Sequence, residues 1–361
     1  MRKTGSSVVV PLVVLLLGFS LPAASRDDRA ARIDTLVMAC HGNGLLNGSV
    51  LVAERGRVIY RKAVGTANVE WDIPCGLDTR FAIFSISKQF TALLGLMMVA
   101  EGKLDLEARV TDYLPYFRKD TGSRIKVRHL FSHSHGLPYA SYHRLPYRNR
   151  LDKEAFFKAY YSEDLAFEPG HGFLYGDGFD LLAAIIEVVA QKPFESLMQE
   201  RIFTPLQLTE TGFWHASANI KRMATNYRES LRLKSEPLYE MPLNGSCALY
   251  STVGDLFKWQ RALAENRLLP REYQDEMFRV QVNFGRPYGF GFDVSECEFA
   301  GQRKRIAWHE GGASAILLWS LDDDKVVILL NNFNGENFRV GREIMNILYG
   351  GPGRVVTREK G

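Results

Sequence analysis

Cysteine is scarce in this sequence of 361 residues. The chain contains four, Cys40, Cys75, Cys247 and Cys297, which stand far apart and form no C-x-x-C pair. This spacing argues against a thiolate-bound metal, and we expect no metal site. Export would permit a disulfide, but four cysteines allow three complete pairings and the sequence does not choose among them.

A strong charge of either sign is also missing. Lysine and arginine number 45 against 41 aspartates and glutamates, which gives a formal net charge of +4. So mild a balance argues against a nucleic-acid partner, because phosphate backbones bind concentrated basic surfaces. Internal repeats and low-complexity linkers are absent from the sequence as well. The length therefore predicts one large domain or two closely associated ones.

Long apolar runs are absent apart from one near the N-terminus. The first 25 residues carry Arg2 and Lys3, then the apolar stretch 8–19, then the small residues 23–25. This order is typical of a cleaved secretory signal peptide, and the run is short for a membrane span. The alternative is an uncleaved N-terminal anchor. We predict a secreted or periplasmic protein whose mature domain, residues 26–361, has no membrane span.

Hydrophobic periodicity divides the rest of the chain into strands at both ends and helices between them. The expected strands are residues 49–53, 58–63, 288–294, 305–309, 314–321 and 325–331. The expected helices are residues 27–41, 179–190 and 338–349, and one within residues 249–264 that Ser251-Thr252 caps. This arrangement predicts an α/β (α+β) sandwich. Both chain ends would build one antiparallel sheet flanked by the terminal helices, with an all-helical region, about residues 105–280, inserted.

One stretch combines a candidate nucleophile with a candidate base. Ser85 stands three residues before Lys88, and apolar residues then recur at helical spacing until Gly102. If Ser85 opens this helix, Lys88 lies one turn further on the same face. The free N–H groups and the dipole of a helix N-terminus suit a serine nucleophile, and a neutral, desolvated lysine amine can accept its proton. The same S-x-x-K spacing recurs at Ser123 and Lys126, where no long apolar helix follows, so we interpret that copy as a turn.

Two further segments can complete a site around Ser85. Tyr175 precedes the apolar helix 179–190 and can share a proton with Ser85 and Lys88, provided that a cation lies near it, because its ordinary pKa is near 10. The glycines of His309-Glu310-Gly311-Gly312 can let a substrate approach the backbone, and an N–H group there can join an oxyanion hole. The alternatives are a tyrosine packed on the core and a plain glycine hairpin.

Two other histidines, His133 and His135, stand in the segment 130–138. We expect them to be loop histidines with satisfied hydrogen bonds rather than catalysts.

The motifs together resemble the serine β-lactamase-related family, which includes class C β-lactamases, D-alanyl-D-alanine carboxypeptidases, D-aminopeptidases and esterases. In chain order they are residues 85–106, residues 130–138, Pro169-Gly170-x-x-Phe173-x-Tyr175, residues 249–256 and His309-x-Gly311-Gly312. The resemblance covers nearly all of the mature chain. It implies the family's α/β sandwich joined to an all-helical region, and hydrolysis through an acyl-enzyme without a cofactor.

Carried over residue by residue, the resemblance also implies roles. Ser85 would be the acylated nucleophile, Lys88 its proton partner, and Tyr175 the group that passes a proton to the leaving group. His309 stands where β-lactamases carry the lysine of their Lys-Thr-Gly motif. The backbone N–H groups of Ser85 and Gly312 would bind the oxyanion.

Departures from the family pattern bear on the substrate. Asp177 occupies the place of an asparagine that holds the acyl amide of a β-lactam, and an aspartate cannot donate that bond unless it is protonated. Cys247-Ala248 replaces a common Gly-Gly, and His309 replaces lysine. These changes argue against efficient β-lactam hydrolysis. We predict an exported serine hydrolase acting on a small ester, amide or D-amino-acid peptide. The alternatives are a β-lactamase or D-alanyl-D-alanine carboxypeptidase, and a non-catalytic binding protein that keeps the fold.

Overall fold

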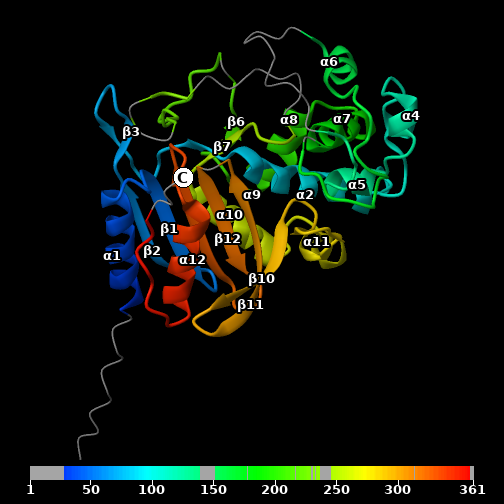
Figure 1. The fold of residues 1–361 in the computed structure, drawn as a ribbon. Coiled ribbons are helices and arrows are strands. Elements are labelled where there is room, and N and C mark those ends of the chain that lie inside the picture. Colours follow the sequence, from blue (N-terminus) through cyan, green and yellow to red (C-terminus); the bar gives the residue numbers. More distant parts are fainter. Residues whose placement is uncertain are drawn as a thin grey trace, which may run out of the picture.

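A large antiparallel sheet forms the centre of the structure (Figure 1). The computed structural model describes residues 28–138, 151–176, 178–215, 217–228, 231, 233–235, 245–312 and 314–357. The sheet has eight strands in the order β2-β1-β13-β12-β11-β10-β9-β8. β1 (Gly48–Glu54) lies between β2 (Arg57–Val64) and the last strand of the chain, β13 (Lys325–Asn331). The predicted sheet built from both chain ends is therefore confirmed.

The other half of the sheet comes from consecutive C-terminal strands. They are β12 (Ala315–Ser320), β11 (Gln302–Gly311), β10 (Asp293–Phe299), β9 (Pro287–Tyr288) and β8 (Val282–Asn283). The expected strand at 288–294 was wrong, because the chain leaves the sheet between Tyr288 and Asp293. A Cβ on Gly289 would lie 2.1 Å from the Met277 carbonyl oxygen, and Gly291 has a φ of +79°. Close packing against neighbouring backbone thus interrupts the strand.

Helices cover both faces of the sheet. In β13, Val327 belongs to an apolar cluster with α1 (Arg29–Gly42) and α12 (Asn337–Leu348). Its neighbour Ile328 points the other way, into the cluster that contains α10 (Val253–Ala264). Figure 1 shows α1 and α12 on one side of the sheet and α10 on the other. Because successive side chains alternate between faces, the central strands β12 and β13 are buried along their whole length and apolar except at their ends.

The region between β2 and β8 is mainly helical, as predicted, and most of it lies beside the sheet (Figure 1). Its helices are α2 (Ser87–Ala100), α3 (Val110–Tyr113), α4 (Lys119–Gly122), α5 (Val127–Phe131), α6 (Lys153–Tyr160), α7 (Gly178–Ala190), α8 (Phe194–Met198), the π-helix η3 (Gln199–Phe203), α9 (Thr204–Leu206), α10 and α11 (Arg271–Phe278). Among the described residues, none of the helices combines the length and the apolar character that crossing a membrane requires.

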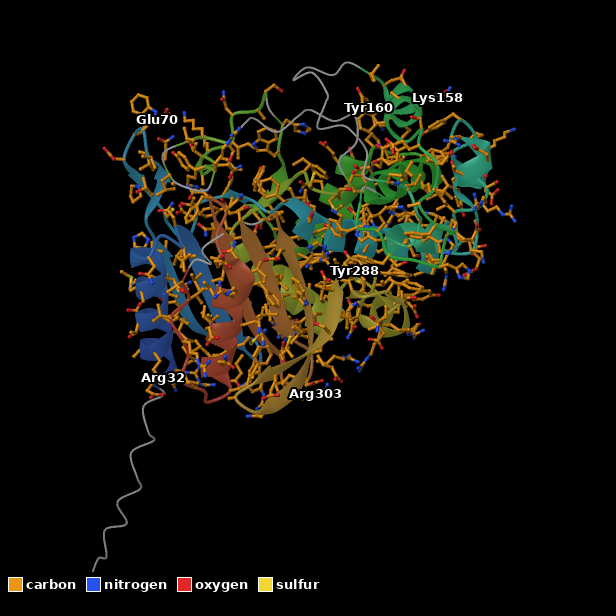
Figure 2. All side chains as sticks on the ribbon, in the orientation of Figure 1. Arg32, Glu70, Lys158, Tyr160, Tyr288 and Arg303 are labelled. Atoms are coloured by element: carbon orange, nitrogen blue, oxygen red, sulfur yellow. The ribbon has the colours of Figure 1, made fainter. Side chains whose placement is uncertain are left out.

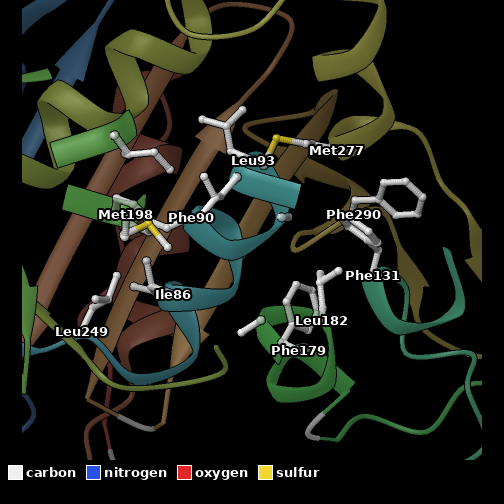
Figure 3. Close-up of a cluster of buried hydrophobic side chains, with 14 of the residues drawn as sticks. Ile86, Phe90, Leu93, Phe131, Phe179, Leu182, Met198, Leu249, Met277 and Phe290 are labelled. Carbon is white, nitrogen blue, oxygen red and sulfur yellow. The ribbon is translucent and has the colours of Figure 1, made fainter. Parts of the chain in front are cut away.

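The helix α2 joins the sheet to the helical region. Every residue from its first position to Met98 is buried. Figure 3 shows Phe90 and Leu93 on this helix, with Met198 on one side and Phe131 on the other. A helix buried all round is held by packing from every direction, so the residues at its N-terminus have a fixed position.

A small three-stranded sheet leads into α2. β5 (Phe81–Ala82) pairs with β7 (Leu249–Ser251), which also pairs with β6 (Gly212–Phe213). The helix expected within 249–264 is α10, and its predicted cap is confirmed: the Thr252 side chain accepts a hydrogen bond from the Asp255 N–H. β3 (Thr66–Asn68) and β4 (Ile73–Pro74) form a separate two-stranded sheet.

Candidate active site

Ser85 lies on a short 3₁₀ turn, η1 (Phe84–Ile86), between β5 and α2. The α-helix itself begins at Ser87, so the expectation that Ser85 opens it was wrong. Ser85 lies on the 3₁₀ turn that directly precedes the helix. Phe84 has a φ of +41°, a left-handed conformation that is uncommon and costly for a bulky residue. The Nζ of Lys88 nevertheless lies 3.0 Å from the Oγ of Ser85. The structure therefore brings together the two residues that the sequence pairs.

Lys88 is enclosed by the protein. Its side chain is 2% exposed, and Nζ also donates to the carbonyl oxygen of Ser246 at 3.1 Å. The N–H of Ser246 in turn donates to Oδ1 of Asp180, in the first turn of α7, at 3.0 Å. This chain of hydrogen bonds fixes the amine beside Ser85 and away from water, which are the conditions for a lysine base.

Tyr175 lies against the same amine. Nζ of Lys88 is 4.9 Å from the centroid of the Tyr175 ring. The ring is half-buried between two imidazoles, with its centroid 4.4 Å from that of His133 and 5.9 Å from that of His309. The structure thus gathers Ser85, Lys88, Tyr175 and His309 in one place. Asp177, two residues further on, lies outside the described residues.

His309 on β11 uses both of its ring nitrogens. Nδ1 is 2.7 Å from the Glu310 carbonyl oxygen, which can only accept, so we assign the hydrogen to Nδ1. Nε2 is then free to accept from the hydroxyl of Tyr288, which is 3.0 Å away. Burial, followed by the charge of Lys88, lowers the pKa of His309 to about 3. His309 is therefore a neutral imidazole at ordinary pH.

The glycines after His309 approach the turn that carries Ser85. A Cβ on Gly311 would lie 2.1 Å from the carbonyl oxygen of Ile83, and Gly312 follows with a φ of +57°. Within the described residues, neither the N–H of Ser85 nor that of Gly312 has a hydrogen-bond partner. Two unengaged N–H groups on segments in contact are what an oxyanion hole requires.

Sequence reasoning missed Arg286 and Tyr288, because neither belongs to a recognised motif. Antiparallel pairing places Asp293 opposite both Tyr288 and Trp308, the residue before His309. Figure 2 shows Tyr288 where the edge of the sheet meets the helical region. The guanidinium carbon of Arg286 lies 5.1 Å from the centroid of the Tyr175 ring.

Arg286 forms an ion pair with Asp293, in which Nη2 donates to Oδ2 at 2.6 Å and Nε donates to Oδ1. Burial acts to lower the pKa of Arg286, but the hydrogen bond and charge of Asp293 outweigh it and raise the pKa. A fixed cation, the guanidinium of Arg286, therefore lies beside Tyr175, and the carboxylate of Asp293 neutralises its charge.

Two other expectations have clear outcomes. The second S-x-x-K copy lies apart from this cluster, because Lys126 is half-exposed and pairs with Glu107 at 2.7 Å. The expectation that His133 and His135 have satisfied hydrogen bonds was wrong in part. Both are fully buried, and Nε2 of each lacks a hydrogen-bond partner among the described residues.

Known proteins are similar to this chain in sequence and in fold. Residues 33–351 match the sequence profile of the Beta-lactamase family. The chain is 30% identical over 322 residues to esterase EstB of Burkholderia gladioli, covering 76% of this chain and 80% of that protein. It is 27% identical over 327 residues to a D-aminopeptidase of Brucella anthropi, covering 86% and 61%. The solved structure of EstCE1, a hydrolase with promiscuous acyltransferase activity, matches with a TM-score of 0.75 at 26% identity, covering 90% and 99%.

Proposed function

The chain belongs to the β-lactamase-related family of serine hydrolases, and from this premise we propose that it cleaves esters or amides through an acyl-enzyme on Ser85. The contact of 3.0 Å between the buried amine of Lys88 and the Oγ of Ser85 carries the proposal. A hydroxyl becomes a useful nucleophile only when a base takes its proton, and this amine lies within hydrogen-bonding distance of it.

The proposed reaction has two halves. Ser85 attacks the substrate carbonyl while Lys88 accepts the hydroxyl proton, and the N–H groups of Ser85 and Gly312 stabilise the oxyanion. Tyr175, beside the same amine, passes a proton to the leaving group as the carbonyl re-forms. Water then attacks the acyl-enzyme with the same groups in reverse order, and this releases the acid and restores Ser85.

We propose an ester, or an amide of a D-amino acid, as the substrate. Esterase EstB supports the first and the D-aminopeptidase supports the second, since their names state those activities. EstCE1 is a hydrolase with promiscuous acyltransferase activity, which is consistent with an acyl-enzyme. A β-lactamase or carboxypeptidase activity remains the alternative. We further propose that residues 1–25 act as a signal peptide, so that residues 26–361 work outside the cytoplasm.

The test is the intact mass of the protein after treatment with a fluorophosphonate and, separately, with a penicillin. We expect one fluorophosphonate on the wild type, none on Ser85→Ala, and a fall in ester hydrolysis on the order of a million-fold in that variant. Ser123→Ala is the matched control, because Ser123 has the same S-x-x-K spacing but lies outside the site; it should react like the wild type.

Three outcomes would contradict the proposal or favour an alternative. Full labelling of Ser85→Ala would show that Ser85 is not the nucleophile, and an unlabelled wild type would favour a non-catalytic binding protein. A stable penicillin adduct would favour the carboxypeptidase alternative.

A further inference from the structure

His133 holds the segment that carries Tyr175 on both sides of that residue. Its carbonyl oxygen accepts a hydrogen bond from the N–H of Leu174 at 3.0 Å. Its ring Nδ1 accepts one from the N–H of Gly176 at 3.3 Å. Between these two bonds, its ring lies 4.4 Å, centroid to centroid, from the ring of Tyr175.

We propose that His133 is a positioning residue that sets the place of the Tyr175 hydroxyl beside Lys88. This proposal rests on the function proposed above, in which Tyr175 passes the proton to the leaving group. His133 touches no reacting atom in it and acts only through Tyr175.

The backbone of His133 adopts an unfavourable conformation that several hydrogen bonds hold in place. His133 stands two residues after α5 with a φ of +55°, a left-handed conformation that few residues with a side chain adopt. The next residue, Ser134, accepts a hydrogen bond from the N–H of Gly170 at 2.8 Å. The surrounding hydrogen bonds thus hold a turn that is costly in isolation, and such turns recur where a fixed geometry is functional.

The contact also requires a neutral imidazole. Because Nδ1 accepts from the Gly176 N–H, the ring hydrogen must be on Nε2. A second proton would place two N–H groups against each other and break the contact. Burial lowers the pKa of His133 well below its ordinary value, and four basic groups act in the same direction: Lys88, His135, His309 and Arg286.

Aromatic packing closes the other side of the ring. The His133 centroid lies 4.9 Å from that of Tyr288 and 5.3 Å from that of Phe179. His133 is 0% exposed, and its Nε2–H has no hydrogen-bond partner among the described residues. The packing therefore holds the His133 ring rigidly against Tyr175. Nδ1 is the ring atom that bonds the backbone of the Tyr175 segment.

The experiment compares two substrates that differ in their need for leaving-group protonation. A p-nitrophenyl ester releases an anion that needs no proton, whereas an alkyl ester of the same acid needs one from Tyr175. In His133→Leu, which keeps bulk but loses Nδ1, we expect kcat/KM for the alkyl ester to fall about a hundred-fold. The fall for the p-nitrophenyl ester should stay below about ten-fold. Simple loss of folded protein would lower both rates equally.

Two further variants isolate the Nδ1 contact. The Oδ1 of His133→Asn stands close to the place of Nδ1 and asparagine tolerates left-handed backbone, so this variant should keep the wild-type ratio of the two rates. His135→Asn is the matched control. His135 is equally buried and accepts from the Leu137 N–H at 3.0 Å. Its replacement should change thermal stability and leave the ratio unchanged.

Equal losses on both esters in a folded His133→Leu, or the same selective loss in His133→Asn, would overturn the proposal. If His133→Leu does not fold, His133→Asn alone decides, because a selective loss there contradicts the role of Nδ1 and a preserved ratio supports it. The reaction of Ser85→Ala with a fluorophosphonate reports separately on the proposed function.

Discussion

At the scale of single residues, His309 is the departure from the expected β-lactamase motif that bears most directly on the charge of the site. A lysine at that place is a fixed cation, which suits the carboxylate of a β-lactam. The imidazole of His309 is neutral, since burial and the charge of Lys88 lower its pKa to about 3. Two basic groups lie near Tyr175: Lys88, the proposed proton acceptor, and Arg286, which is paired with Asp293. The site thus has less unbalanced positive charge than the lysine would give it.

This difference predicts the order of substrates. At pH 7.5 we expect kcat/KM for a neutral p-nitrophenyl ester or a D-amino-acid amide to exceed that for an anionic cephalosporin by roughly a hundred-fold, because one missing charge in a partly buried cleft is worth a few kcal/mol. The ester-to-cephalosporin ratio should stay constant from pH 6 to pH 8, since His309 remains neutral there. A cephalosporin that is turned over faster than both other substrates would contradict this prediction and identify Arg286 as an effective anion-binding group.

Local sequence selected Ser85, Lys88 and Tyr175 as candidates, because the Ser85–Lys88 spacing and the loop before the apolar helix 179–190 carry that information. It could not identify Tyr288 or Arg286. Tyr288 meets His309 only because β9, β10 and β11 pair in one register, and that register is a property of the folded sheet. The importance of His133 was missed for the same reason, since its partners lie about forty residues away along the chain.

At the scale of elements, the approach of β11 to η1 builds the region around Ser85, the proposed nucleophile. Gly311 allows the approach, since a Cβ there would lie 2.1 Å from the backbone oxygen of Ile83. A backbone atom cannot rotate away as a flexible side chain can, so the strand would have to shift. The proposed oxyanion donors, Ser85 and Gly312, lie on these two elements and would separate.

We therefore expect Gly311→Ala to lower kcat/KM for a p-nitrophenyl ester by about 10²–10³-fold, the usual effect of losing one oxyanion donor. Gly42→Ala is a suitable control, because Gly42 has open space around its Cβ position and ordinary backbone geometry. It should leave the rate unchanged. Thermal unfolding of both variants would separate a local shift from global destabilisation. A Gly311→Ala enzyme with wild-type activity would show that this close approach is dispensable.

The boundaries of an element could be predicted where the local hydrophobic pattern sets them. The predictions failed where contacts with residues distant in sequence set the boundaries. The strand 325–331 was predicted at its full length because it is buried on both faces. The strand expected at 288–294 failed because Gly291 packs against α2, where a Cβ would lie 2.9 Å from the Lys88 carbonyl oxygen. No local pattern reports that contact, although it is part of what brings Tyr288 and Lys88 into one site.

At the scale of the whole molecule, the two chain ends are joined by charge as well as by strand pairing. Glu54 at the end of β1 pairs with Arg29 of α1 at 3.0 Å and with Lys325 of β13 at 2.7 Å. The Nζ of Lys325 also donates to the carbonyl oxygen of Leu348 at the end of α12, at 2.9 Å. One carboxylate therefore connects elements from both ends of the described chain.

We expect Glu54→Gln to lower the free energy of unfolding by about 2 kcal/mol at pH 7, because Lys325 would lose the counter-ion of a largely buried amine. Glu296→Gln is the matched control. Glu296 pairs with Arg303 on the surface, where both side chains are more than half exposed. Such exposed pairs contribute little, so this variant should unfold like the wild type in urea.

The pH dependence of this loss tests its electrostatic origin. Burial alone would raise the pKa of Glu54, but the hydrogen bonds and charges of Lys325 and Arg29 outweigh it and hold the pKa below its ordinary value of 4.5. A carboxyl group whose pKa is lower in the folded state stabilises fully above its unfolded pKa, and this contribution disappears as the pH falls through the folded pKa. The difference in unfolding free energy between wild type and Glu54→Gln should therefore be constant from pH 7 to about pH 5.5 and shrink below about pH 4.5. A difference that stays the same down to pH 3 would mean that Glu54 acts through packing rather than through its charge.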